Sequence, residues 1–590
     1  MSKTRLKIVL WLILGVTAVT LVLGTITSAA RLIAYFQAGA DPASALHIVP
    51  NVPPDLQVAL AWLPDDADTG RQMEPLTRTQ IESAYLRAWF QWNISYLRGE
   101  PYGLQTYFVG PALAAADEAV LAAGLQGFSL AQTDLSHQLQ LHFYAADGSI
   151  VSLTAHDVLV AQIIRDAAGA PIFSGVTQAD YDVVMMLEDG NWRVRHWVRR
   201  RAVPLAVATQ VAEVPADFVR VDGGQLLVGE RPFPIRGVNY YPQATPWLAF
   251  WPAYDPAIIE QDLGQIESLG LNTVRIFVPY PLPKPDPLAD GPPAADVDSE
   301  ALFRQNLADF LDKAESHHLK VIVTLFDFRT DYQILLWPNA DRALAAIVPY
   351  FADHPAVLAW DLKNEPDLDQ PGNTPEMVNA WLEYIAWQVR RQDANHLITI
   401  GWSESEAAAQ LAEVVDFVSF HEYGAPADLP EKYAQLRTAV PHKPIVLTEF
   451  GLSTWNSSFF PGGHTENEQA VYYAAMRQAL AETDAAGYIA WTLYDFASVP
   501  SNVAGRAPWR IGSQEHLGIL HADGASKPAA LLLGETSDWG VKRPFFLARF
   551  LKPFWRTIWI VLGGCILGGI WLARRKRAPK PDALPADCNQ

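Results

Sequence analysis

Two carboxylates and an amide stand where apolar, strand-like runs end. The stretch "LAWDLKNEPDL" is mostly apolar up to Asn364 and Glu365, and Pro366 follows at once. A second run, "PIVLTEFG", closes on Glu449. An unpaired buried carboxylate is costly, so packing alone does not explain two of them at the ends of apolar runs. We interpret both as reactive groups able to give or take protons, and we expect Pro366 to favour an extended conformation at Glu365.

The elements that must position these groups form a regular series over residues 217–535. Eight short β-rich runs alternate with helical stretches, which predicts parallel strands joined by crossover helices. Eight such units close into a (β/α)8 barrel, an α/β fold whose active site lies at the carboxyl ends of the strands. Further polar or aromatic residues stand at these predicted strand ends: Arg275, His421, Tyr423 and Trp491.

A smaller domain is predicted before the barrel. Residues 75–203 carry helical apolar spacing first and alternating, strand-like runs afterwards. The "DG" pairs at 147–148 and 189–190 lie between strand-like runs, as hairpin turns do. Two helices followed by a long antiparallel sheet resemble the NTF2-like (cystatin-like) fold. Its histidines show no ligand spacing, so we interpret the domain, which a linker at 32–74 precedes, as a docking or spacer module with an unknown protein partner.

Both ends of the chain carry membrane signals. Residues 8–30 contain no charge over 23 positions, enough to cross a hydrocarbon core of about 30 Å. The segment 1–31 therefore predicts a cytoplasmic N-terminus and a membrane-spanning helix; a cleaved signal peptide is the alternative. A second uncharged run, 557–573, follows a basic, aromatic juxtamembrane segment at 541–556 and precedes a basic tail at 574–590. Positive flanks place both termini in the cytoplasm and the barrel outside the cell, at the cell membrane.

Composition narrows the function classes. The net charge of −20 argues against a nucleic-acid surface, because phosphates would be repelled. Cys565 and Cys588 are the two cysteines, so the large middle of the chain has neither disulfide nor thiol chemistry. Calcium loops, zinc spacings, Walker loops and dinucleotide fingerprints do not stand out, and we expect no cofactor and no metal.

The barrel resembles glycoside hydrolase family 5, the cellulase and β-mannanase group, over residues 230–500. "NEP" after the fourth strand, "HEY" after the sixth and "TEFG" after the seventh carry the resemblance, because all three stand in order at the right strand ends. It implies a polysaccharide or oligosaccharide substrate of β-glucan or β-mannan type, with cleavage through a covalent glycosyl-enzyme intermediate.

The resemblance also implies a role for each site residue. Glu365 is similar to the general acid/base, and Glu449 to the nucleophile. Asn364 is similar to the residue that holds the sugar 2-hydroxyl, and Arg275 to the arginine that supports the nucleophile. His421 and Tyr423 are similar to the polar pair of the sixth strand. Trp491 is similar to the tryptophan of the eighth strand, which lies under the sugar at the cleavage point. Such chemistry needs one ionised and one protonated carboxyl, and the charge of Glu449 is expected to hold the proton on Glu365.

One departure and two alternatives remain. Many family members carry a histidine at the end of the third strand, where this chain has "VTLFDFRTDY" and Asp327 or Arg329 takes that place. The sugar and the linkage are therefore open. An inactive carbohydrate-binding protein is a second hypothesis, and a transglycosylase that uses the same two glutamates is a third.

Overall fold

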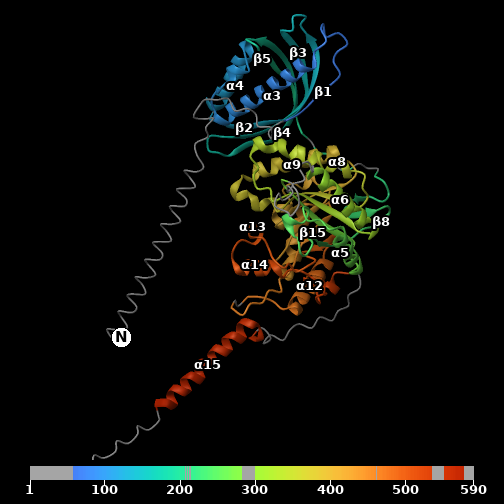
Figure 1. The fold of residues 1–590 in the computed structure, drawn as a ribbon, viewed down its shortest axis with the longest axis vertical. Helices are drawn as coiled ribbons and strands as arrows, with labels where there is room; N and C mark the ends of the chain where they lie inside the picture. Colours follow the sequence, from blue (N-terminus) through green and yellow to red (C-terminus); the bar gives the residue numbers. More distant parts are fainter. Residues whose placement is uncertain are drawn as a thin grey trace, which may run out of the picture.

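Figure 1 shows the computed structural model. It describes residues 58–125, 127–205, 207–208, 210, 214–281, 299–459, 462–534 and 550–576. The predicted first membrane span and the proline-rich loop after the second barrel strand lie outside these residues.

The predicted barrel is confirmed. Eight parallel strands close in the order β10-β11-β12-β13-β14-β15-β16-β9. The strands are β9 Ile235–Asn239, β10 Thr273–Pro279, β11 Lys320–Asp327, β12 Val357–Asn364, β13 Leu397–Trp402, β14 Val418–His421, β15 Ile445–Glu449 and β16 Gly487–Ala490. Most of their residues are buried on both faces, as expected of parallel strands covered by crossover helices.

Helices surround the barrel and follow the strands in turn. The larger ones are α5 Pro256–Ser268, α6 Ser299–Ser316, α7 Trp337–Ala345, α9 Pro375–Gln392, α11 Leu429–Ala439 and α12 Glu466–Ala481. Four shorter ones are α8 Val348–Phe351, α10 Ser405–Ala408, α13 Ser501–Ala504 and α14 Pro508–Glu515. Local signals fix their starts: Asp255 caps α5, and Thr465 with Glu468 forms a capping box on α12.

A small antiparallel sheet covers the amino-terminal end of the barrel. It consists of β6 Val219–Asp222, β7 Gln225–Val228 and β8 Arg231–Pro232. Val219 and Leu226 pack in one apolar cluster with Ile235, Ile322 and Leu358 from the barrel strands. Because this end is closed by side chains, the opposite end is left to accept a ligand.

The first domain has two helices and a five-stranded sheet. Helices α3 Pro75–Arg98 and α4 Gly110–Leu125 precede the long strands β2 Ser129–Tyr144, β3 Ile150–Arg165, β4 Pro171–Glu188 and β5 Asn191–Pro204, and β1 Ala59–Trp62 pairs in parallel with β2. The "DG" pairs turn between β2 and β3 and between β4 and β5, as predicted. The identification with the NTF2-like group stays a prediction.

The first domain rests directly on the barrel. Leu135, Leu159 and Ile163 from its sheet belong to the same apolar cluster as the barrel helices. Arg165 Nη2 donates to Thr374 Oγ1 at the start of α9, at 2.6 Å. In Figure 1 the domain stands over α8 and α9. Continuous apolar packing makes this a fixed docking rather than a loose tether.

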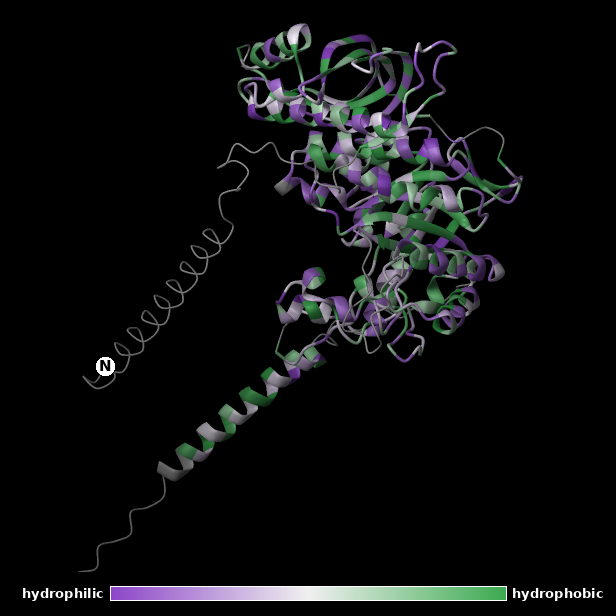
Figure 2. Cartoon of the chain, turned by 45° about the horizontal axis from the view of Figure 1, so that its top comes forward, coloured by the Kyte–Doolittle hydropathy of each residue, from purple (hydrophilic) through white to green (hydrophobic). Residues whose placement is uncertain are grey.

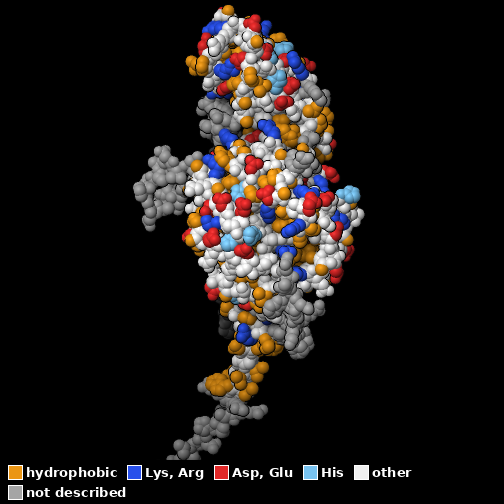
Figure 3. Space-filling model, turned by 90° about the vertical axis from the view of Figure 1, so that its right-hand side faces the viewer, with side chains coloured by type: hydrophobic (Ala, Val, Ile, Leu, Met, Phe, Trp, Pro, Cys, Tyr) orange, Lys and Arg blue, Asp and Glu red, His pale blue; other side chains and the backbone are white. Residues whose placement is uncertain are grey.

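The helix α15, Pro553–Lys576, projects away from both domains (Figures 1 and 2). Within the described residues, one helix is long and apolar enough to cross a membrane: the 20 residues Pro553–Leu572, of which 0% are buried. Figure 3 shows its hydrophobic side chains as a separate group below the barrel. The predicted second span lies inside this helix.

Candidate active site

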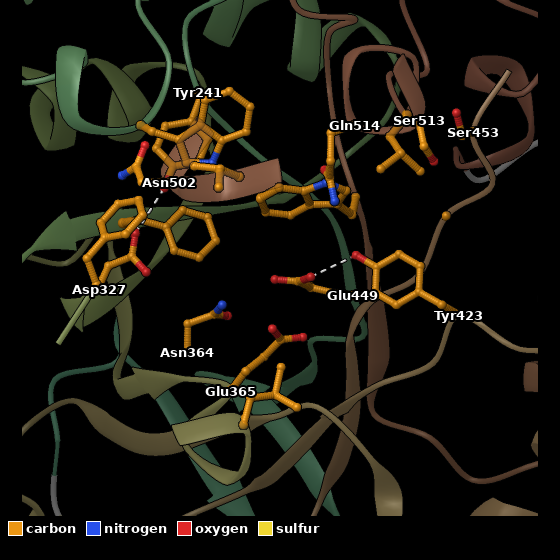
Figure 4. Close-up of a pocket in the computed structure, with 18 of the residues that line it drawn as sticks. Tyr241, Asp327, Asn364, Glu365, Tyr423, Glu449, Ser453, Asn502, Ser513 and Gln514 are labelled. Carbon is orange, nitrogen blue, oxygen red and sulfur yellow. Dashed lines mark hydrogen bonds between the residues drawn. The ribbon is translucent and has the colours of Figure 1, made fainter. Parts of the chain in front are cut away.

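A cavity of about 740 Å³ opens at the carboxyl ends of the barrel strands. Five of the seven predicted site residues line it: Asn364, Glu365, Tyr423, Glu449 and Trp491. Figure 4 shows the carboxylates of Glu365 and Glu449 pointing toward one another across it. The two others, Arg275 and His421, are buried and reach these residues through hydrogen bonds.

The two glutamates come close to each other. An oxygen of Glu365, an oxygen of Glu449 and a ring nitrogen of His421 all lie within 4.8 Å of one another. Arg275 Nη1 and the Tyr423 hydroxyl both donate to Glu449, at 2.7 and 2.8 Å. A divalent ion could use the same three groups, but the guanidinium beside Glu449 repels cations. The arrangement suits carboxyl chemistry better than metal binding.

The backbone at Glu365 differs from the expected extended conformation. Its φ is 47° and its ψ is 52°, in the left-handed region. Pro366 disfavours the right-handed helical alternative, and Glu365 N donates to Gly401 O at 2.6 Å. A left-handed non-glycine residue costs about 1–3 kcal/mol. The strain falls on the residue whose carboxylate enters the cavity.

Arg275 organises a buried ionic cluster beneath the cavity. Besides Glu449, its guanidinium donates to Asp361 Oδ2 at 2.6 and 3.0 Å and to the side-chain oxygens of Asn364 and Asn239 at 2.8 and 3.0 Å. A Cβ on Gly401 would lie 2.7 Å from Arg275 Nη2, so a larger residue here would displace the guanidinium. Despite burial, the two carboxylates raise the pKa of Arg275. The cluster fixes Glu449 next to a permanent cation.

Tyr423 stays a hydrogen-bond donor. Burial together with the charges of Glu449 and Glu365 raises the pKa of its hydroxyl well above the ordinary value. A protonated phenol and a guanidinium therefore both donate hydrogen bonds to Glu449.

Glu365 faces a different environment. Burial raises the pKa of its carboxyl, but the hydrogen bond from His421 Nδ1, at 2.9 Å, lowers it, and the pKa lies below its usual range. The sequence-based expectation was a protonated Glu365 at rest, held by the charge of Glu449. The structure adds a donor that this expectation lacked. The other ring nitrogen, His421 Nε2, is buried without a hydrogen-bond partner among the described residues.

The structure separates the two candidates at the end of the third strand. Asp327 lines the cavity and accepts a hydrogen bond from the Tyr241 hydroxyl at 3.2 Å. Arg329 instead lies among the rings of Tyr280, Tyr332 and Trp381, at 4.7 to 5.7 Å from their centroids. Of the two candidates, Asp327 therefore takes the place at the end of the third strand where many family members carry a histidine.

Several lining residues were missed or misjudged from the sequence. Lys363 and Asp369 form an ion pair at 3.3 Å in the cavity wall, and neither was predicted. The signal for Lys363 was a charged residue inside an apolar strand. Aromatic side chains also line the cavity, among them Tyr241, Trp247 and Trp455. Four others are buried and do not line it: Tyr240, Trp251, Trp337 and Trp402.

Replacing Asp327 with asparagine is expected to stabilise the protein above pH 6 and to weaken activity. Burial raises the pKa of Asp327 from 3.8 to about 6, so the folded state holds its proton more tightly than the unfolded state. The folded state therefore loses stability as pH rises from 4 to 6, by about 3 kcal/mol at 1.36 kcal/mol per pH unit. The asparagine side chain has no proton to lose, so the advantage of the variant grows over this range.

Thermal unfolding at pH 4.5 and pH 8 measures the effect. Activity is expected to fall about tenfold or more, because a charged hydrogen-bond acceptor in the cavity wall is lost. The exposed Asp331→Asn serves as control and should change neither property. An Asp327→Asn variant no more stable than wild type at pH 8 would contradict the burial argument.

Comparisons with known proteins agree with the geometry. Residues 230–497 match the family model Cellulase (glycosyl hydrolase family 5). Mannan endo-1,4-beta-mannosidase 3 of Oryza sativa subsp. japonica is 27% identical over 331 residues, covering 43% of this chain and 67% of its own length. Mannan endo-1,4-beta-mannosidase A of Hypocrea jecorina is 25% identical over 228 residues, 34% of this chain and 49% of its own.

The likeness to solved structures is weaker. An exo-beta-1,4-mannosidase from Opitutaceae bacterium strain TAV5 is 20% identical, with a TM-score of 0.41, over 51% of this chain and 58% of that one. The family model covers the barrel and leaves the first domain and α15 unmatched.

Proposed function

We propose that this protein, whose barrel is a member of glycosyl hydrolase family 5, is a retaining β-glycosidase that forms a covalent glycosyl-enzyme intermediate. One observation carries the proposal: carboxylate oxygens of Glu365 and Glu449 lie within 4.8 Å of each other. Retaining glycosidases place their carboxyl groups about 5–5.5 Å apart, whereas inverting enzymes need about 6.5–9.5 Å to admit a water molecule.

Glu449 is the proposed nucleophile. Arg275 and Tyr423 donate to its two oxygens and hold the carboxylate at the cavity, which it lines. It attacks the anomeric carbon, and the glycosidic bond to the leaving-group oxygen breaks as Glu365 delivers a proton to that oxygen. The amide nitrogen of Asn364 is left to donate to the sugar, because its oxygen accepts from Arg275.

Glu365 must gain a proton before the first step. Burial is already the largest influence on its pKa and acts upward, and a bound sugar removes further water from the site. We expect substrate to shift the balance from the hydrogen bond of His421 toward protonation of Glu365. Once Glu449 has become an ester, its charge is gone and Glu365 serves as the base that activates water.

A β-1,4-mannan is the substrate to test first, because the named relatives are mannan endo-1,4-beta-mannosidases; β-glucan is the second. We place the barrel outside the cell, anchored through the apolar segments at the two ends of the chain. Transglycosylation uses the same intermediate, and a competing sugar acceptor distinguishes it from hydrolysis by its products.

The proposal is tested by the first product. The purified protein is given a β-mannotriose or β-glucotriose aryl glycoside, and proton NMR follows the anomeric signal before mutarotation. We expect the β-anomer to form first. An α-anomer as first product would rule out Glu449 as nucleophile. If neither the mannose nor the glucose series were turned over, a carbohydrate-binding protein would be favoured.

A further inference from the structure

We infer that the mouth of the cavity lies in the headgroup layer of the membrane that α15 crosses, and that the substrate is a glycan carried on a lipid of that same membrane. The lipid-linked substrate rests on the proposed glycosidase function; the placement of the mouth does not. The inference begins at Lys552, immediately before α15.

Lys552 ties the start of α15 to the wall of the active site. Its Nζ donates to Gly463 O at 2.7 Å and pairs with Glu468 Oε1 at 2.9 Å. Gly463 lines the cavity, and Glu468 belongs to the capping box of α12. The Lys552 side chain is only 14% exposed. The apolar helix therefore leaves the protein directly at the cavity wall.

The length of the helix sets the position of the bilayer. The helix is exposed, with 0% of its apolar window buried, and it needs a bilayer around it. Its uncharged run, residues 557–573, covers about 25 Å at 1.5 Å per residue, close to the thickness of a hydrocarbon core. The uncharged stretch begins at Thr557, five residues after Lys552, or about 7.5 Å along a helix. The headgroup layer is about 5–7 Å deep on each side of the core. Lys552 and the Gly463 carbonyl it binds thus lie at the level of the headgroups.

The cavity wall next to Lys552 is rigidly held. Trp455, in the same loop as Gly463, packs so closely on α14 that a Cβ on Gly512 would lie 2.2 Å from its Nε1. Thr454 N donates to His516 O at 2.8 Å just after α14. These contacts hold Thr454 and Trp455 against α14, and Lys552 connects Gly463 to the start of α15.

Exposed aromatic side chains lie in this loop and on α14. Phe459, between Trp455 and Gly463 in the chain, is 86% exposed, and Trp509 of α14, which lines the cavity, is 52% exposed. Aromatic residues favour the boundary between headgroups and hydrocarbon. Their position agrees with a mouth that meets the headgroup layer.

A mouth at this level favours substrates held in the same layer. A sugar attached to a lipid is confined beside the cavity at a high effective concentration, whereas a soluble polysaccharide has no such advantage. The ligand chemistry is an amphiphile: a β-linked oligosaccharide whose reducing end continues into a hydrocarbon anchor.

The substrate is tested with the full chain reconstituted in phosphatidylcholine vesicles. The probes are mannotetraose β-linked to a dialkylglycerol in the same vesicles and methyl β-mannotetraoside in solution, with the cellotetraose pair in parallel. We expect the lipid-linked probe to be cleaved at least about tenfold faster at equal bulk concentration. Lys552→Ala should lose this preference and keep its rate on the soluble probe. Lys313→Ala, a similarly buried lysine paired on α6, should keep both.

The possible failures are distinguishable. Equal rates on both probes would overturn the lipid-linked substrate while leaving the glycosidase intact. Turnover of neither probe would overturn the proposed glycosidase function itself.

A second measurement needs no substrate and tests the placement of the mouth. A nitroxide is attached at Phe459→Cys in a Cys565→Ser, Cys588→Ser background, and a lipid with a nickel-chelating headgroup is added to the vesicles. The label should relax strongly, whereas one at Tyr350→Cys on α8, 62% exposed, should not. Equal relaxation at the two positions would overturn the placement.

Discussion

Replacing Glu449 with alanine is expected to lower kcat at least about 10⁴-fold on every substrate. The variant lacks the carboxylate proposed to attack the anomeric carbon, and removal of a nucleophile costs losses of this size in other enzymes. Good leaving groups should not rescue the variant, because the lost step is bond formation rather than protonation. Initial rates on mannan oligosaccharides and on their dinitrophenyl glycosides measure the effect.

Glu365→Ala is expected to behave differently with the two substrate types. Protonation of the leaving group is unnecessary for dinitrophenol, so the first step should survive with that substrate and fail with an oligosaccharide, by about 10²–10⁴-fold. The second step then lacks its base. Added azide, which needs no general base, should restore turnover and give a β-glycosyl azide.

Glu422 provides the matched control for both substitutions. It is a buried glutamate beside His421, but its carboxylate accepts from Lys432 Nζ and Gly424 N, both at 2.6 Å, and it does not line the cavity. Glu422→Gln should therefore keep kcat within a few-fold of wild type. If azide restored the turnover of Glu449→Ala and gave a β-glycosyl azide, the roles assigned to Glu449 and Glu365 would have to be exchanged. If azide failed to restore the turnover of Glu365→Ala, the assignment of Glu365 as acid/base would be contradicted.

The sequence was a good guide to the barrel and to the edge where the candidate site residues meet. Apolar runs ending in "NEP", "HEY" and "TEFG" recur at a period that only parallel strands with crossovers explain, and parallel strands bring their carboxyl ends to one edge. Glu365, His421 and Glu449 were therefore expected to meet, and atoms of all three lie within 4.8 Å.

The partners beneath that edge were harder to predict. Asp361 and Asn239 bind Arg275 through side chains at 2.6 and 3.0 Å, yet each looks like one more residue of an apolar strand. Which polar residue of a strand points inward depends on register, and β12 shifts register against β13 between Asp361 and Asn364. The left-handed conformation of Glu365 was also missed. A residue before proline has only a local preference for extended backbone, and the hydrogen bond from Glu365 N to Gly401 O overrides this preference.

Replacing Arg275 with methionine is expected to lower the free energy of unfolding by about 3–5 kcal/mol, because it leaves two buried carboxylates, Asp361 and Glu449, without their cation. The side chain of Arg275 is 0% exposed and those of its partners 1% and 6%, so water cannot replace the charge.

Urea denaturation measures the loss, with Arg200→Met as control: that arginine is 61% exposed in its pair with Asp182 and should cost less than about 1 kcal/mol. Arg275→Lys should recover part of the stability and little activity, because an ammonium cannot hold Asp361, Glu449 and Asn364 at once. A loss below about 1 kcal/mol in Arg275→Met would contradict the role of Arg275 as the cation that the two buried carboxylates require.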